Sequence, residues 1–137
     1  MSYEYVLTAE FSASPEAIFE AWLSSEGHTA MTGGVAHTSP EVGAAFDAWD
    51  GYISGVNLEI EPGARILQTW RTQHFPGDDP DSTIEIHLEA VPGGTRLTLT
   101  HSNVPDGQTS YEEGGWQSHY FEPMKRRFGW LERDIKP

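Results

Sequence analysis

One histidine of this chain is placed where it could do chemistry. His101 follows Leu97 and Leu99 at intervals of two residues, so on a strand it faces the same side as these apolar residues. An imidazole in an apolar pocket near Tyr120 could act as a general base or orient a ligand carbonyl. The more common alternative is a hydrogen-bonded structural histidine at a strand end. His101 is therefore only a weak catalytic candidate.

The remaining reactive side chains form no catalytic or metal-binding motif. The six histidines show neither His-x-His nor His-Glu-x-x-His spacing, and the chain has no cysteine, so we expect no metal and no thiol nucleophile. Asp47 and Asp50 flank Trp49 and could form an acid–base pair, but Asp50-Gly51 is also a common hairpin turn. We expect no cofactor, and the sequence favours a binding protein over an enzyme without excluding catalysis.

A group of apolar and aromatic residues is expected to converge between a sheet and the last helix. Aromatic rings together with methionines are typical of an adaptable pocket for apolar ligands. The alternative is that the same side chains simply fill the core. We name this group the predicted set: Met31, Phe46, Trp70, Phe75, His101, Trp116, Tyr120 and Met124.

Charge narrows the choice of partners. The net charge is -13, and residues 1–64 contain no lysine or arginine. An acidic surface repels phosphate groups, so we expect neither a nucleic acid nor an anionic membrane as partner. Lys125, Arg126, Arg127 and Arg133 form a small basic patch near the C-terminus. This patch could meet an acidic partner or complement the dipole of the last helix.

Length and hydropathy suggest a simple organisation. At 137 residues the chain is expected to form one domain, residues 1–137. The N-terminus lacks the features of a signal peptide, and no apolar run approaches the roughly 20 residues of a membrane span. We therefore expect a cytoplasmic protein, either a monomer or a homodimer.

The spacing of apolar residues predicts the helices and strands that would position these side chains. Residues 3–11 alternate as a half-buried strand, and Ser14 followed by Pro15 predicts the start of a helix that ends near residue 24. A short second helical turn covers 25–31. A helix over 115–130 has a stripe formed by Trp116, Tyr120, Met124 and Phe128, with a kink expected from Pro123. Closely spaced strands are predicted at 34–38, 44–50, 53–61, 64–73, 82–91 and 94–103.

Alternation along these strands predicts which side chains face inward. One strand would direct Val56, Leu58 and Ile60 toward the core and Asn57 toward water. The same reasoning assigns to the inner face a second group of residues: Ile66, Gln68, Trp70, Ile84, Ile86, Leu88, Leu97, Leu99 and His101. The order of elements predicts an α+β fold with a curved antiparallel sheet around the C-terminal helix.

Several segments also resemble a known family. The combination of QTWR, HSNVP and GWQSHYFEPMK is similar to the C-terminal domain of the Aha-type activators of the heat-shock protein 90 ATPase, which belong to the START-like, or SRPBCC, superfamily. The match covers essentially the whole chain through segments 66–76, 82–84, 94–99, 103–105 and 115–128, with 47–52 included loosely. The resemblance implies a helix-grip (Bet v-like) fold, with about six to seven strands around a long C-terminal helix.

The residues and the resemblance together lead to three hypotheses for the function. The superfamily commonly holds an apolar ligand between sheet and helix, which gives the first hypothesis, a ligand-binding protein. The second is a factor that acts on heat-shock protein 90 through the 104–114 loop and the last helix. The co-chaperones carry a separate N-terminal domain for much of their chaperone binding, and we expect this chain to lack it. The third is a small cyclase or hydrolase that uses the cavity.

Overall fold

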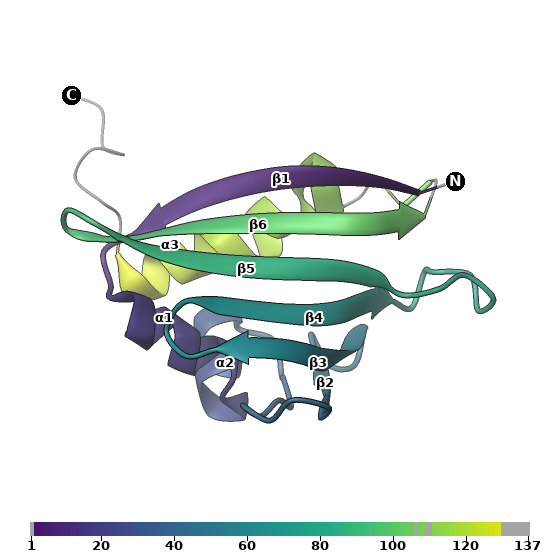
Figure 1. The fold of residues 1–137 in the computed structure, drawn as a ribbon, viewed down its shortest axis with the longest axis horizontal. Helices are drawn as coiled ribbons and strands as arrows, with labels where there is room; N and C mark the ends of the chain where they lie inside the picture. Colours follow the sequence, from purple (N-terminus) through teal and green to yellow (C-terminus); the bar gives the residue numbers. More distant parts are fainter. Residues whose placement is uncertain (1, 106, 109–110, 130–137) are drawn as a thin grey trace.

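A six-stranded antiparallel sheet forms one layer of the molecule, and the helices cover one of its faces (Figure 1). The computed structural model describes residues 2–105, 107–108 and 111–129. The strand order is β1-β6-β5-β4-β3-β2, which confirms the predicted α+β helix-grip architecture. The strands are β1 (Ser2–Phe11), β2 (Ala45–Ala48), β3 (Ile53–Glu61), β4 (Arg65–Thr72), β5 (Ser82–Val91) and β6 (Gly94–Pro105). The helices are α1 (Pro15–Trp22), α2 (Ser25–Thr32), the π-helical turns η1 (Tyr111–Gly115) and η2 (Gln117–Phe121), and α3 (Glu122–Phe128).

The two N-terminal helices begin at serine caps. The Ser14 hydroxyl accepts a hydrogen bond from the Ala17 N–H at 3.1 Å, and the Ser24 hydroxyl accepts one from the Gly27 N–H at 3.1 Å. Each cap satisfies an amide that the first helical turn leaves without a partner. Helix α2 ends at Gly33, whose left-handed φ of 90° suits glycine.

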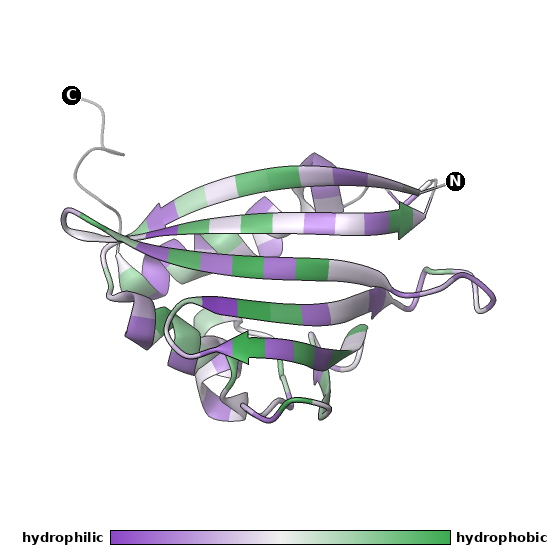
Figure 2. Ribbon diagram, viewed as in Figure 1, coloured by the Kyte–Doolittle hydropathy of each residue, from purple (hydrophilic) through white to green (hydrophobic). Residues whose placement is uncertain are grey.

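Alternating hydropathy along β4, β5 and β6 is visible in Figure 2 and sets the inner face of the sheet. The inward residues predicted on these strands are all buried, Gln68 and His101 included. Strand β3 differs from the prediction, because Asn57 is buried whereas Leu58 is 41% exposed. The pairing of β3 with β4 shifts register between Asn57 and Glu59, so a bulge exchanges the faces at this point.

The predicted strand at 34–38 is wrong. Within the described residues, this segment forms only one isolated bridge, in which the amides of His37 and Asp47 each donate to the other residue's carbonyl, at 3.0 and 2.9 Å. It begins at Gly34, directly after Gly33, and the side chain of Trp49 lies against Gly34. The chain therefore passes β2 closely without continuing the ladder.

The C-terminal helix is less regular than predicted. Regular α-helix extends only from Glu122 to Phe128; Gln117–Phe121 is π-helical, and the segment before it has a kink at Gly114, whose backbone is not helical. The Glu122 N–H bonds the Gln117 carbonyl, five residues back. Pro123 has no amide hydrogen to continue an α-helical ladder, which accounts for an irregularity immediately before it. The apolar stripe predicted for this helix is buried at three of its four residues, namely Trp116, Tyr120 and Met124.

No helix in the described ranges is long and apolar enough to cross a membrane. In the same part of the chain, no group of three or more histidine, aspartate or glutamate side chains is arranged to hold a metal ion.

Candidate functional site

The predicted set lies in the interior between the sheet and the C-terminal helical segment. Its members are between 0 and 7% exposed and belong to one continuous hydrophobic core, His101 excepted as a polar member. Ring contacts connect them, with centroids 4.8 Å apart for Trp70 and His101, and 5.1 Å apart for Trp116 and Tyr120. The structure therefore brings these residues together, as side chains that pack against one another.

His101 lies in a continuous hydrogen-bond network. The indole N–H of Trp116 can only donate, and it lies 3.1 Å from the Tyr5 hydroxyl and 3.3 Å from His101 Nδ1. Tyr5 lies 2.8 Å from the same Nδ1, and Ser82 lies 2.8 Å from Nε2. Ser82 in turn donates to the Trp70 carbonyl. We call this the His101 network.

The network assigns the protonation state of the histidine. Because Trp116 donates to Tyr5, the Tyr5 hydroxyl donates to Nδ1, and Nε2 carries the ring proton that Ser82 accepts. Burial lowers the pKa of His101 from 6.5 to about 3, so the ring is neutral. Burial raises the pKa of Tyr5 well above its usual value. Both ring nitrogens are engaged, which favours the structural interpretation of His101 over a general base.

A second buried histidine connects the helices. His28 Nδ1 donates to the Trp22 carbonyl at 2.9 Å, and its Nε2 accepts from the Tyr120 hydroxyl at 2.8 Å. The Trp22 indole N–H then bonds Gln68, and Gln68 bonds Asn57. Burial lowers the pKa of His28 to about 4. These contacts explain why Asn57 is buried, and they fix α1, α2 and η2 against the sheet.

The two buried histidines predict how stability depends on pH. Folding lowers the pKa of His101 from 6.5 to about 3 and the pKa of His28 from 6.5 to about 4. At a pH between the folded-state pKa and 6.5, the unfolded chain therefore binds more protons than the folded protein. The free energy of unfolding is therefore fully retained above pH 6.5 and falls as the pH is lowered. At about pH 5 we expect each histidine to remove about 2 kcal/mol. Urea denaturation at successive pH values measures the slope.

Single-site variants separate the two contributions. In His28→Gln the pH-dependent loss should drop by about half relative to the parent protein. His87→Gln provides the matched control, because His87 is exposed on β5, and its profile should follow the parent. A free energy of unfolding that stays level between pH 7 and 5 would contradict the assignment of two buried neutral histidines.

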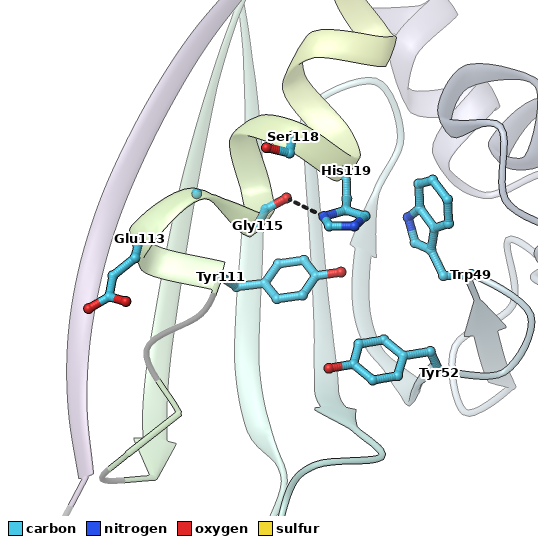
Figure 3. A pocket seen from close by; sticks show the side chains of 8 residues that line it. Trp49, Tyr52, Tyr111, Glu113, Gly115, Ser118 and His119 are labelled. Carbon is cyan, nitrogen blue, oxygen red and sulfur yellow. Dashed lines mark hydrogen bonds between the residues drawn. The ribbon is translucent and has the colours of Figure 1, made fainter.

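An aromatic cleft opens beside the buried core, between the β2–β3 turn and the π-helical turns (Figure 3). Its volume is about 630 Å³, which is within the range of small-molecule sites. Trp49 and Tyr52 face it from the turn, and Tyr111 and His119 face it from η1 and η2. The other lining residues are Glu113, Gly114, Gly115 and Ser118. None of the predicted set lines this cleft.

Two glycines pack closely against aromatic rings that line the cleft. A Cβ on Gly34 would lie 2.4 Å from the Trp49 ring, and a Cβ on Gly115 would lie 2.7 Å from the Tyr111 ring. Both distances are too short for real carbon contacts, so only glycine permits these ring positions. Tyr111 also packs edge-on against Trp70 with centroids 4.9 Å apart, which joins the cleft to the core.

The turn that carries Trp49 has an uncommon backbone. Trp49 and Asp50 have φ values of 53° and 57°, and Gly51 follows with 84°. A left-handed conformation costs about 1–2 kcal/mol for a residue with a side chain. Such strain is concentrated at functional sites. The turn thus fixes the backbone that presents the Trp49 ring to the cleft.

The other sequence candidates have structural roles in the described residues. Asp47 bonds His37 Nδ1 at 2.9 Å, whereas Asp50 lies in the left-handed turn, so the two carboxylates do not form a pair. Lys125, Arg126 and Arg127 lie in the last turn of α3, where they complement the helix dipole. Arg133 lies outside the described residues.

Sequence reasoning did not identify the residues of the cleft. The sequence points to Trp49 only as the residue between Asp47 and Asp50, Tyr52 lies in the loosely matched segment 47–52, and Tyr111 lies in the 104–114 loop. A usable signal was present, since two large aromatic residues flank an Asp-Gly turn and Tyr111 precedes a pair of glycines. Aromatic residues in turns and loops that a rigid scaffold positions are candidates for binding.

Comparison with known proteins gives a consistent family assignment. The family model described as "Activator of Hsp90 ATPase homolog 1-like protein" matches residues 12–129. A human protein, "Activator of 90 kDa heat shock protein ATPase homolog 1", is 28% identical over 93% of this chain. The match covers 37% of the human protein, so this chain spans about a third of the length of that relative.

Solved structures show the same fold. An HSP90 activator from Plasmodium falciparum superposes with a TM-score of 0.82 at 24% identity, covering 91% of this chain and 95% of that one. A protein from Mesorhizobium loti superposes with a TM-score of 0.74 at 25% identity, covering 90% of this chain and 94% of its own.

Proposed function

The chain belongs to the family of Activator of Hsp90 ATPase homolog 1-like proteins, and from this premise we propose that it binds a small, mainly apolar ligand in the aromatic cleft. The observation that carries the proposal is the cleft itself, about 630 Å³ in volume and walled by Trp49, Tyr52, Tyr111 and His119. Gly34 and Gly115 leave room for the Trp49 and Tyr111 rings, and the strained turn fixes the backbone at Trp49. The rings are thus in position before a ligand binds, which lowers the entropic cost of binding.

Members of the predicted set pack against Tyr111, which lines the cleft. Trp70 and Trp116 pack against Tyr111 with centroids 4.9 and 5.2 Å away, and Trp116 packs on Tyr120. We propose that this buried group holds the Tyr111 ring in place, so that this side of the cleft is rigid when a ligand binds. Direct ligand contact by the predicted set stays a prediction, as do the cytoplasmic location and the oligomeric state.

Replacing Trp49 with alanine tests the proposal. We expect the affinity for the neutral dye Nile red to fall at least about tenfold, because a large part of the aromatic wall is lost. Trp49 is only half-buried, so the thermal midpoint should change much less than it does after a core substitution. Dye fluorescence measures the first quantity and calorimetry the second.

Val6→Ala is the matched control for this experiment. Val6 is 53% exposed on the outer face of β1, away from the helices. Its substitution should leave the dye affinity at the parent value. If Trp49→Ala binds Nile red as tightly as the parent protein, the dye is not in the cleft and the proposal is wrong.

A second candidate function is an action on the ATPase of a heat-shock protein 90 chaperone. The observation that favours it is the 28% identity to a protein named for activating that ATPase. Its proposed contact surface includes the described part of the 104–114 loop and the basic side chains of α3. The test is the ATPase rate of the chaperone from the same organism, titrated with this protein; a flat titration removes the candidate.

Catalysis by the chain itself, the third hypothesis, depends on His101, whose ring nitrogens are both engaged.

A further inference from the structure

We propose that the aromatic cleft selects a neutral, flat ligand with a hydrogen-bond-accepting oxygen, such as an aryl ketone, and that the Tyr111 hydroxyl is the donor that recognises it. This inference rests on the proposed function, because it specifies the ligand class of the same cleft. It adds a polar determinant to a site whose walls are otherwise aromatic.

Tyr111 has the properties that this role requires. Its ring is fixed by Trp70, Trp116 and His119, with centroids between 4.9 and 5.7 Å away. Its hydroxyl makes no hydrogen bond to any residue in the described ranges, and it points toward the side of the cleft that carries Tyr52 (Figure 3). Burial raises the pKa of Tyr111 well above its usual value, so the group remains a protonated donor. A fixed donor without a partner is suited to bind an acceptor from outside.

The indole of Trp49 points to the same chemistry. Its Nε1 is buried and lacks a hydrogen-bond partner among the described residues. In Figure 3 this nitrogen lies on the edge of the ring that faces His119. His119 gives its Nδ1 proton to the Gly115 carbonyl at 3.2 Å. An unpaired buried donor costs about 1–3 kcal/mol, so a ligand oxygen that reached it would recover part of that energy.

The charges of the lining residues and of the whole chain disfavour an ionised ligand. None of the lining residues is a lysine or arginine, and the chain as a whole carries a net charge of -13, so a carboxylate or phosphate would meet no counter-charge in the cleft. A cation would benefit from Glu113, but that side chain points away from the aromatic rings in Figure 3. The hydroxyls of Tyr52 and Tyr111 and the indole of Trp49 carry no charge, which favours a neutral ligand.

A matched series of naphthalene probes tests the inference. The probes are ethylnaphthalene, naphthyl methyl ketone, naphthoate and trimethyl(naphthyl)ammonium, titrated by calorimetry into the parent protein and into Tyr111→Phe. We expect the ketone to bind the parent more tightly than either ion. In Tyr111→Phe the ketone affinity should fall by about fivefold to tenfold, which corresponds to one lost hydrogen bond, whereas the ethylnaphthalene affinity should stay within about twofold.

Tyr3→Phe is the matched control, because the Tyr3 hydroxyl bonds the Gln108 carbonyl and does not line the cleft. It should bind all probes as the parent does. The inference is overturned if Tyr111→Phe keeps the ketone affinity, or if either ion binds more tightly than the ketone. In both cases binding of ethylnaphthalene or Nile red would leave the proposed function standing. If neither of those two ligands binds, the proposed function fails and the inference fails with it.

Discussion

Replacing Trp116 with alanine is expected to lower the free energy of unfolding by about 3–5 kcal/mol, because the side chain is fully buried and leaves a large cavity. The indole N–H is also the first donor of the His101 network, so its loss removes a hydrogen bond to Tyr5. Urea denaturation followed by circular dichroism measures the change. Against a total stability of about 5–15 kcal/mol, a loss of this size could unfold part of the population at room temperature.

Trp116→Phe separates packing from hydrogen bonding. Phenylalanine retains an aromatic ring but no N–H, so a smaller loss of about 1–2 kcal/mol is expected. If Trp116→Ala cost less than about 1 kcal/mol, the side chain could not occupy the buried position described here. Because of the expected loss of stability, Trp116 variants are poor probes of ligand binding, and the turn residue Trp49 is the better choice.

Gly55→Ala is expected to be the most damaging of the small substitutions. A Cβ at this position would lie 1.9 Å from the Thr69 carbonyl oxygen and 2.6 Å from a ring carbon of Phe46. The first neighbour is backbone of the paired strand β4, which cannot move without breaking the ladder. We expect a loss of about 3 kcal/mol or more, at or beyond the upper end of the usual overpacking range. The measurement is the thermal midpoint together with the yield of folded protein.

Gly77→Ala is the control for that experiment. Gly77 has open space at its Cβ position, so the same chemical change should alter stability by no more than about 0.5 kcal/mol. Equal midpoints for the two variants would show that β3 and β4 do not approach each other as closely as the structure indicates.

The strands and their inner faces could be predicted because alternation in β4, β5 and β6 follows directly from burial on one side. The prediction failed at Asn57, where a bulge reverses the faces. A bulge depends on contacts between strands, here the bond from Gln68 to Asn57, and these contacts leave no local pattern. It also failed at 34–38, where burial alternates from Gly34 to His37 but the segment has only one bridge to β2.

The candidate site was harder to predict than the fold. Periodicity identifies residues that face the core, and the predicted set is therefore a correct list of buried neighbours. The cleft is formed instead by Trp49, Tyr52 and Tyr111, which lie at turns or helix starts where no periodicity applies. The left-handed conformation of Trp49 could not have been expected, since residues other than glycine rarely adopt it.

The location of the cleft residues has a consequence for how related proteins can diverge. The residues that hold the fold together lie on the strands and the inner side of the helices, whereas Trp49 and Tyr52 lie on a turn that joins β2 to β3. Turns tolerate substitution better than strands do. Selection could therefore change the ligand proposed for this cleft by exchanging a few turn residues while the core sequence is preserved. A library randomised only at these positions would be a practical starting point for altering specificity.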